Sequence, residues 1–241
     1  VFGSGNWSVS QVITLTGLDD NVSDDNQSTL LTLSLSSSDG KYDNSSLSAQ
    51  TVTVTTSDND TVAVLISESS LSVGEDGTSD TFTVRLNSEP TSTVLVSMDL
   101  NGSDELSVSD NLSFSPDNWS QVQTVTVTGL DDNVSDDNQT SVLSVLSSSS
   151  DSKYNGLSDN LSVVTADNDT VGLILSRSSA SVSENGTFSD NFSVVLQSEP
   201  TADVTLSVTD NDTSEVSYSP LSLVFGSGNW SVSQVITLTG L

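Results

Sequence analysis

The strongest constraint on this chain is an internal repeat. Residues 1–18 read VFGSGNWSVSQVITLTGL, and residues 224–241 repeat them letter for letter at a distance of 223 residues. A looser copy, SFSPDNWSQVQTVTVTGL, occupies residues 113–130, so the shared glycine falls at Gly17, Gly129 and Gly240, with spacings of 112 and 111. Self-similarity at a fixed period is typical of tandem modules. The sequence therefore predicts two related modules of about 111 residues in each period of 223.

Other motifs keep the same register and mark the module boundaries. Asp-Asn-Asp-Thr-Val begins at Asp58 and again at Asp167, and Ser-Glu-Pro-Thr begins at Ser88 and again at Ser198. These positions predict the second half of one module at 1–60, a complete module at 61–169 and the first part of a third at 170–241. We expect such a sequence to be one period of a longer, nearly identical array, in which neither an initiator Met nor a signal peptide would appear.

Within the complete module, apolar and polar residues alternate with period two in short runs rich in Val, Thr and Leu. This alternation is typical of half-buried strands, and no helical periodicity accompanies it. The expected strands cover 62–67 continuing through 71–73, then 82–86, 94–98, 112–114, 125–128, 142–146 and 161–165. Seven strands in about 110 residues predict an all-β fold of immunoglobulin-like sandwiches, repeated head to tail.

The charge balance excludes several functions. The chain has 33 acidic and 4 basic residues, a formal net charge of −29, and neither His nor Cys. A nucleic-acid partner or a membrane-surface patch would need a basic face, and catalysis by His or Cys is impossible. Val, Leu, Ile and Phe make up 68 of the 241 residues. That fraction exceeds the ~20% typical of disordered chains, so we expect a folded chain whose charge is neutralised by a cation.

The acidic residues gather at one end of the predicted sandwich. If consecutive strands run antiparallel, the first-to-second, third-to-fourth and fifth-to-sixth connections and the exit of the seventh strand share that end. They carry twelve acidic residues: Glu75, Asp76, Asp80, Asp99, Asp104, Glu105, Asp131, Asp132, Asp136, Asp137, Asp167 and Asp169. The opposite end carries four: Glu89, Asp117, Asp151 and Asp159. Crowded carboxylates are typical of Ca²⁺ sites, which take six to eight oxygen ligands, although acidic residues can also simply keep a surface soluble.

Three motifs in order resemble those of the Calx-beta family and of related calcium-dependent bacterial adhesin repeats. They are a glutamate after the first strand (SVGEDG from Ser72, SVSENG from Ser181), the acidic GLDDNVSDD from Gly129, and the terminal Asp-Asn-Asp. The resemblance covers the whole chain and implies a seven-stranded sandwich with Ca²⁺ at one end. Asn59 and Asn168 stand where the family often has an acid, which leaves the number of ions per module open.

The resemblance also implies ligands in each module. The candidates in the complete module are Glu75, Asp104, Asp131, Asp132, Asp136, Asp167 and Asp169. The third module offers Glu184, Asp210 and Asp212, and the first offers Asp19, Asp20, Asp24, Asp58 and Asp60.

Sixteen of the eighteen Asn residues stand in Asn-x-Ser/Thr, the acceptor motif for N-linked glycans. They are Asn6, Asn21, Asn26, Asn44, Asn59, Asn101, Asn111, Asn118, Asn133, Asn138, Asn160, Asn168, Asn185, Asn191, Asn211 and Asn229. The excess favours glycosylation of an exported surface. The alternative is that Ser and Thr, at 80 of 241 residues, generate the motif and the repeats then copy it. The absence of Cys is consistent with an exported array stabilised by metal.

The aromatic residues leave two functions open. Trp7, Trp119 and Trp230 occupy equivalent Asn-Trp-Ser motifs, where an indole would either pack over the end of the core or stack on a sugar. Tyr42 and Tyr154 are expected to anchor a loop. The hypothesis from the sequence is a non-enzymatic, extracellular fibre or adhesin stalk stiffened by Ca²⁺, whose partners are copies of itself, with no nucleic acid and no membrane insertion. The alternative is a module that binds carbohydrate or a cell surface through its Trp loops.

Overall fold

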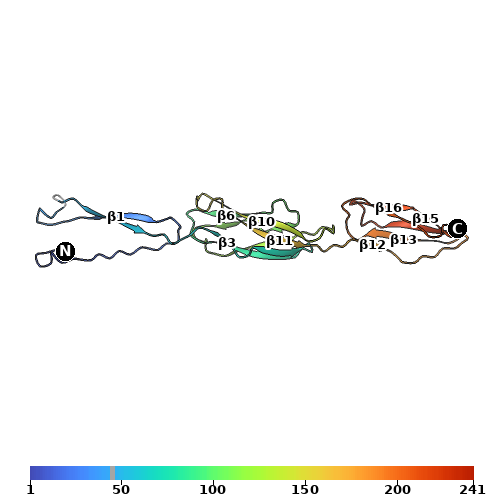
Figure 1. Ribbon diagram of the computed structural model, residues 1–241, viewed down its shortest axis with the longest axis horizontal. Helices are drawn as coiled ribbons and strands as arrows, with labels where there is room; N and C mark the ends of the chain where they lie inside the picture. The colour runs from blue at the N-terminus through green and yellow to red at the C-terminus, as the bar shows by residue number, and fades with distance from the viewer. Residues whose placement is uncertain (44–46) are drawn as a thin grey trace.

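The chain is built from β-strands, turns and bends alone. The computed structural model describes residues 1–43 and 47–241, and no helix occurs among them. Three groups of strands follow one another along the long axis, with the two termini at opposite ends (Figure 1). The predicted all-β class is confirmed, and the described residues include no apolar helix of membrane-spanning length.

The central group is a two-sheet sandwich. Its strands are β3 (Val64–Ile66), β4 (Ser70–Gly74), β5 (Ser79–Leu86), β6 (Val94–Asp99), β7 (Leu106–Val108), β8 (Leu112–Phe114), β9 (Gln123–Gly129), β10 (Gln139–Ser149) and β11 (Ser158–Ala166). One sheet has the order β4-β11-β10-β6-β8 and the other the order β3-β5-β9-β7. All pairings are antiparallel except that of β4 with β11, which is parallel.

Alternating side chains of both sheets meet in one core. Phe82 and Val125 from one sheet and Phe114, Leu143 and Leu161 from the other are each no more than 1% exposed. Full burial of such a side chain contributes about 1.5–3 kcal/mol. The period-two pattern of the sequence therefore corresponds to the inward faces of these strands.

The central group has nine strand segments where the sequence predicted seven runs. The first predicted run is divided, because β3 pairs with β5 in one sheet whereas β4 pairs with β11 in the other. β7 was not predicted, although its Leu-Ser-Val alternates in the same way as the predicted run at 112–114. It pairs with β9 and leads into the loop before β8.

The first and third groups have fewer strands. Among its described residues, 1–43 and 47–60, the first has only the hairpin of β1 (Gln27–Leu33) and β2 (Gln50–Thr56). The third has β12 (Leu173–Leu175), β13 (Ser189–Leu196), β14 (Val204–Ser207), β15 (Val216–Ser219), β16 (Ser222–Phe225) and β17 (Gln234–Gly240). Its sheets have the orders β12-β13-β17-β15 and β14-β16, and a smaller core lies between them.

Candidate metal centre

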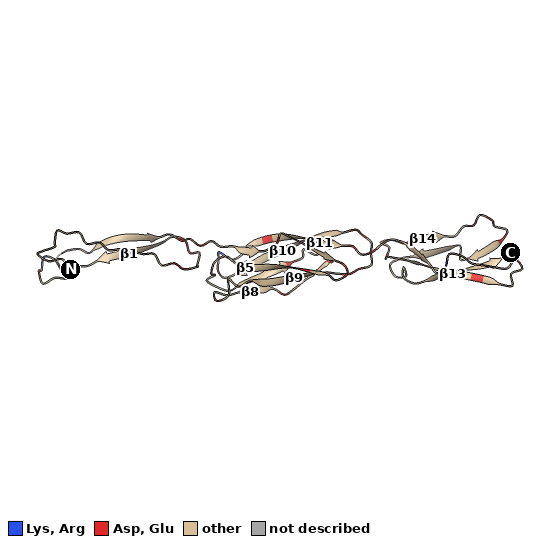
Figure 2. Ribbon diagram, turned by 90° about the horizontal axis from the view of Figure 1, so that it is seen from below, with Lys and Arg blue, Asp and Glu red and all other residues tan. Residues whose placement is uncertain are grey.

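Four connections converge at the end of the central sandwich that faces the third group. They are the turn after β4, the β6–β7 loop, the β9–β10 loop and the segment after β11, and acidic stretches lie where neighbouring groups of strands meet (Figure 2). The turn after β4 lies against the end of β9 so closely that a Cβ at Gly129 would collide with the carbonyl oxygen of Gly74. A glycine is therefore required there, and the close approach brings Glu75 beside the β9–β10 loop.

Three carboxylates from three of these connections form a compact cluster. Glu75, Asp132 and Asp169 each offer one oxygen, and these oxygens lie within 4.8 Å of one another. Glu75 is only 1% exposed, and Oδ2 of Asp169 is buried without a hydrogen-bond partner. Buried carboxylates cost free energy unless they are paired, and oxygen-only clusters of this kind suit Ca²⁺. The donor set and the unpartnered oxygen both fit a bound divalent cation.

The electrostatics of the cluster also favour a cation. Burial, followed by the charges of Asp132, Asp167 and Glu105, raises the pKa of Glu75 above its ordinary value, although the Asn168 N–H lowers it. Burial and then Asp167, Asp131 and Asp132 raise the pKa of Asp169. A bound cation would offset this repulsion.

Asp167 organises the cluster through the main chain. Its Oδ2 accepts hydrogen bonds from the N–H groups of Asp136 at 3.1 Å and Asp137 at 2.9 Å, and its Oδ1 accepts one from Asp169 at 2.7 Å. Asn168 adds a bond from its side-chain Nδ2 to Asp131 Oδ1 at 3.3 Å. The segment after β11 is thereby tied to the β9–β10 loop, which fixes the relative positions of two cluster residues.

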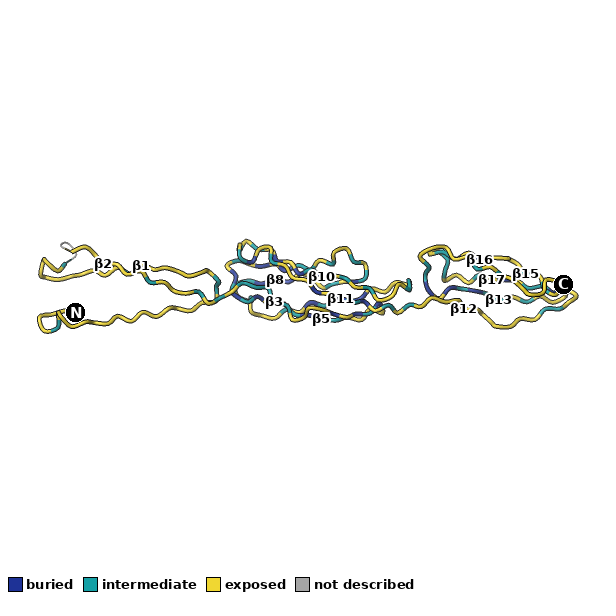
Figure 3. The backbone as a smooth tube through the Cα atoms, viewed as in Figure 1, coloured by how far each residue is buried: buried dark blue, intermediate teal, exposed yellow. Residues whose placement is uncertain are grey.

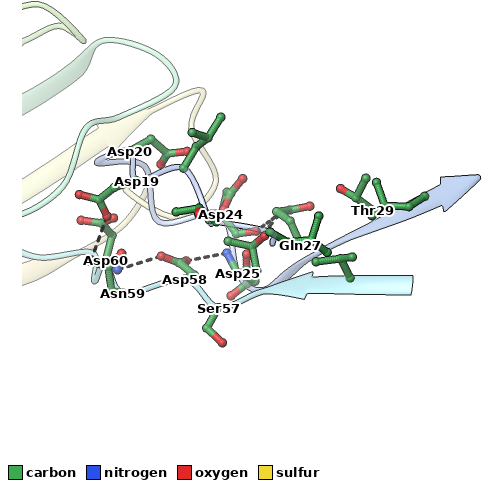
Figure 4. A pocket seen from close by; sticks show the side chains of 17 residues that line it. Asp19, Asp20, Asp24, Asp25, Gln27, Thr29, Ser57, Asp58, Asn59 and Asp60 are labelled. Carbon is green, nitrogen blue, oxygen red and sulfur yellow. Dashed lines mark hydrogen bonds between the residues drawn. The ribbon is translucent and has the colours of Figure 1, made fainter. Parts of the chain in front are cut away.

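The first group of strands carries a second copy of this arrangement (Figure 4). Asp58 Oδ2 accepts from the Asp25 N–H at 2.7 Å, and its Oδ1 accepts from the Asp60 N–H at 2.8 Å. Asn59 Nδ2 donates to Asp19 Oδ1 at 3.3 Å, as Asn168 does to Asp131. Burial and then the charges of Asp58, Asp19, Asp20 and Asp24 raise the pKa of Asp60. This copy has all its aspartates but no counterpart of Glu75.

The predicted ligands of the third group are not among the described residues that form a three-carboxylate group. Glu184 is exposed in the turn before β13, and Asp210 and Asp212 are exposed in the loop after β14. The side chain of Ser214 donates to Asp212 at 2.6 Å and lowers its pKa. Within residues 1–43 and 47–241, only Glu75, Asp132 and Asp169 meet the spacing of a three-carboxylate group.

In the β6–β7 loop, the predicted ligand Asp104 is exposed and its neighbour Glu105 is half-buried. Burial and then the charges of Asp136, Asp132 and Asp104 raise the pKa of Glu105. The main-chain oxygen of Glu105 also accepts from the Leu130 N–H at 2.9 Å. Glu105 was missed because the short alternation of β7 was not assigned to a strand, and the register of β7 decides which of the two neighbouring acids is the more buried.

The β9–β10 loop also contacts the next group of strands. The Asn133 carbonyl accepts from the Glu199 N–H at 2.6 Å, and in the equivalent place the Asn21 carbonyl accepts from the Glu89 N–H at 2.7 Å. Lys153 Nζ adds an ion pair with Asp25 Oδ2 at 3.0 Å across the junction between the first group and the central sandwich. The loop that supplies Asp132 to the cluster thus also holds the following group.

The glycosylation motifs fall into two kinds. In one kind, Nδ2, the atom that would carry a glycan, donates a hydrogen bond to the protein; these residues are Asn6, Asn59, Asn101, Asn118, Asn168 and Asn229. Most of the remaining motif residues are exposed, including Asn111 and Asn191. Asn44 lies outside the described residues. The geometry therefore disfavours glycans at these six motifs, which include the two Asp-Asn-Asp segments, and the other motifs stay predictions.

The tryptophans of the central and third groups pack on the protein. Trp119 and Trp230 are partly buried against the two cores, whereas Trp7, in the first group, is 73% exposed. Tyr154 is 1% exposed, and its hydroxyl donates to the Ser88 carbonyl at 2.7 Å and accepts from the Ser88 N–H at 3.0 Å. These contacts favour the packing interpretation of the Trp motifs and the anchoring role expected of Tyr154.

Comparison with known proteins assigns no family. No protein-family model and no curated protein sequence matches the chain. Among solved structures, CBD12 of CALX1.1, described as a calcium-binding domain, is 19% identical over 74% of this chain and 76% of its own, with a TM-score of 0.33. The periplasmic chaperone SfaE is 10% identical over 44% of this chain and 58% of its own, with a TM-score of 0.36. Domains 4–9 of the surface-layer protein SbsC are 14% identical over 80% of this chain and 29% of their own, with a TM-score of 0.30. Similarities this weak reveal nothing of the ligands or partners of this chain.

Proposed function

We propose that this chain is a structural repeat protein of an extracellular fibre or adhesin stalk, in which Ca²⁺ bound at the ends of β-sandwich modules holds successive modules head to tail. The observation that carries the proposal is the cluster of Glu75, Asp132 and Asp169, whose oxygens lie within 4.8 Å of one another. A cation there would neutralise part of the net charge of −29. No enzymatic activity is proposed. The acidic loop is repeated along the chain and is held by main-chain hydrogen bonds, an arrangement that suits cation binding better than a unique catalytic site.

The link from cation to fibre is the β9–β10 loop. A cation bound to Asp132 restrains this loop, and the loop carbonyl of Asn133 accepts the Glu199 N–H of the next group. Because the first group repeats the same contact between Asn21 and Glu89, the restraint would recur at every junction. Stability and stiffness then add up along the array, as in other repeat proteins.

Small-angle scattering of the monomer, separated by size-exclusion chromatography, tests this role in CaCl₂ and in EDTA. We expect a longer, more rigid particle in calcium. The double variant Asp131→Asn, Asp132→Asn should remove most of that difference, while its charge-matched control Asp110→Asn, Asp117→Asn, at exposed positions, should keep it. Equal rigidity of the parent protein in calcium and in EDTA would overturn the proposed role.

A further inference from the structure

The two lysines of the chain occupy equivalent places in the repeat. Lys41-Tyr42 and Lys153-Tyr154 lie 112 residues apart, which is also the spacing of Gly17 and Gly129. The eight residues that follow them differ, DNSSLSAQ against NGLSDNLS, so the Lys-Tyr pair is kept where the rest of the loop is not. In a chain with 33 acidic and four basic residues, this placement points to a specific acidic partner.

Lys153 stands on a platform of two loops, β5–β6 and β10–β11, at the end of the central sandwich that faces the first group. Figure 3 shows buried segments at this end. Tyr154 is 1% exposed, and its hydroxyl is bonded to the main chain and Oγ of Ser88. Asp151 joins the same two loops, because its Oδ1 accepts the Lys153 N–H at 3.0 Å and its Oδ2 accepts the Thr91 N–H at 2.8 Å. These bonds fix the main chain from which the Lys153 side chain extends.

The platform makes two contacts with the acidic loop of the first group, residues 19–25. The Glu89 N–H donates to the Asn21 carbonyl at 2.7 Å, and Lys153 Nζ lies 3.0 Å from Asp25 Oδ2. One contact is a main-chain hydrogen bond and the other is an ion pair, and they meet the loop four residues apart. Two such points restrain the rotation of the sandwich about the loop, which a single bond would leave free.

The backbone of the acidic loop holds Asp25 in place. Its φ is 65°, in the left-handed region that few residues other than glycine adopt, and its N–H donates to Asp58 Oδ2 at 2.7 Å. Its counterpart Asp137 has φ 67° and donates to Asp167 Oδ2 at 2.9 Å. Among the described residues Asp137 makes no ion pair, so this conformation belongs to the loop and does not depend on a lysine. The loop therefore presents the Asp25 carboxylate at a fixed place.

We propose that the Lys153–Asp25 ion pair is a calcium-independent latch that fixes the orientation of the central sandwich on the preceding group, with Lys153 as the positioning residue. Opposite charges on the facing ends favour head-to-tail order, since two acidic ends would repel each other. The inference deepens the proposed stalk function and rests on it for the use of the latch along an array. The contacts themselves involve no calcium.

The exposure of the pair sets the size of the expected effect. The side chains of Lys153 and Asp25 are 36% and 86% exposed, and exposed ion pairs change an equilibrium by between about 1.4-fold and fivefold. Loss of the pair should therefore lower the ratio of docked to undocked junctions by up to about fivefold, while the bond from Glu89 to Asn21 remains. Salt should have the same effect, because it screens exposed charges.

Distances between two spin labels, measured by pulsed electron paramagnetic resonance in EDTA at low ionic strength, test the latch. The chain has no Cys, so Thr53→Cys in β2 and Ser162→Cys in β11, both at exposed positions, label one group each. The labelled parent should give a narrow distance distribution, Lys153→Gln a broader one, and Lys153→Arg one close to the parent. The matched control Lys41→Gln should keep the narrow distribution, because Lys41 is exposed and makes no ion pair among the described residues. Equal distributions in the parent and Lys153→Gln, or equal broadening in Lys41→Gln, would overturn the proposal.

A second variant acts on the other side of the junction. Asp25→Asn removes the charge, and Asn tolerates the left-handed conformation. It should broaden the distribution as much as Lys153→Gln, and the double variant should broaden it no further, because both changes remove the same contact. Raising the salt concentration should broaden the parent to the level of the variants. Additive broadening in the double variant, or a parent that does not respond to salt, would contradict the latch.

Adding calcium to the same labelled proteins separates the latch from the proposed calcium function. If Lys153→Gln is broader than the parent in EDTA and calcium narrows neither, the latch stands and the calcium function fails. If the two match in EDTA and calcium narrows both, the latch fails and the calcium function stands.

Discussion

Replacing Glu75 by Gln should have opposite effects on the stability of the protein in the absence and in the presence of calcium. In EDTA at neutral pH the Glu75→Gln variant should be more stable than the parent, because burial and neighbouring carboxylates raise the pKa of Glu75 and so disfavour its charged form. In calcium the variant should be less stable than the parent, because one of three clustered carboxylates is lost. The Asn168 N–H, 3.3 Å from Glu75 Oε2, can still donate to the amide oxygen, so local packing is preserved.

The size of the calcium effect follows from mass action. Calcium at 100 times its dissociation constant stabilises by ~2.7 kcal/mol. In a unit of about 110 residues, with an unfolding entropy near 2.1 cal/mol/K per residue, this corresponds to a rise of about 12 °C in Tm. If losing the ligand weakens binding ~100-fold, the remaining stabilisation is ~0.4 kcal/mol, or about 2 °C.

Thermal unfolding followed by near-ultraviolet circular dichroism of the parent, Glu75→Gln and Glu184→Gln measures this difference. Glu184 is the exposed counterpart of Glu75, and its replacement should leave the calcium shift unchanged. Equal calcium shifts in the parent and in Glu75→Gln would refute the assignment of Glu75 as a ligand.

Three further predictions concern pH, a buried hydroxyl and a glycine. Burial raises the folded-state pKa of Glu75 and Glu105, so the stability of the protein in EDTA should fall as pH rises from ~4.5 through the raised pKa values. Denaturant titrations should show this fall, and adding calcium should restore the lost stability. Tyr154→Phe should cost about 1–3 kcal/mol in urea unfolding through the lost hydrogen bonds to a buried loop, whereas Tyr42→Phe, at a side chain 62% exposed, should stay within about 0.5 kcal/mol; equal effects would contradict the anchoring role. Gly129→Ala should destabilise the central sandwich by about 1–3 kcal/mol, because the new Cβ collides with the turn after β4. It should also weaken calcium binding measured by calorimetry. Unchanged calcium affinity would show that the close approach of Gly129 to this turn is not needed for the metal site.

The sequence predicted those parts of the fold that depend on local pattern. Period-two alternation found the strands that bury Phe82 and Leu143, because each such strand has one face on the core. It did not predict the parallel pairing of β4 with β11, which depends on contacts about ninety residues apart in the chain. It also treated the three repeats as alike, although Leu33 and Val204 are 46% and 38% exposed, whereas their counterparts in the repeat, Val145 and Val94, are 2% and 0% exposed.

The sequence also predicted some residues of the candidate site and not others. Glu75, Asp132 and Asp169 were expected from motif positions, and the structure brings all three together. Motif position alone did not separate the clustered aspartates from Asp167, whose oxygens accept three main-chain N–H groups. Nor could it choose Glu105 over Asp104, since that choice depends on the register of a three-residue strand.

The most direct test of the calcium assignment is anomalous diffraction from crystals of the chain grown in CaCl₂. The account predicts an anomalous peak about 2.3–2.6 Å from carboxylate oxygens of Glu75, Asp132 and Asp169. Well-ordered density for the three carboxylates in saturating calcium, with no anomalous peak between them, would contradict it.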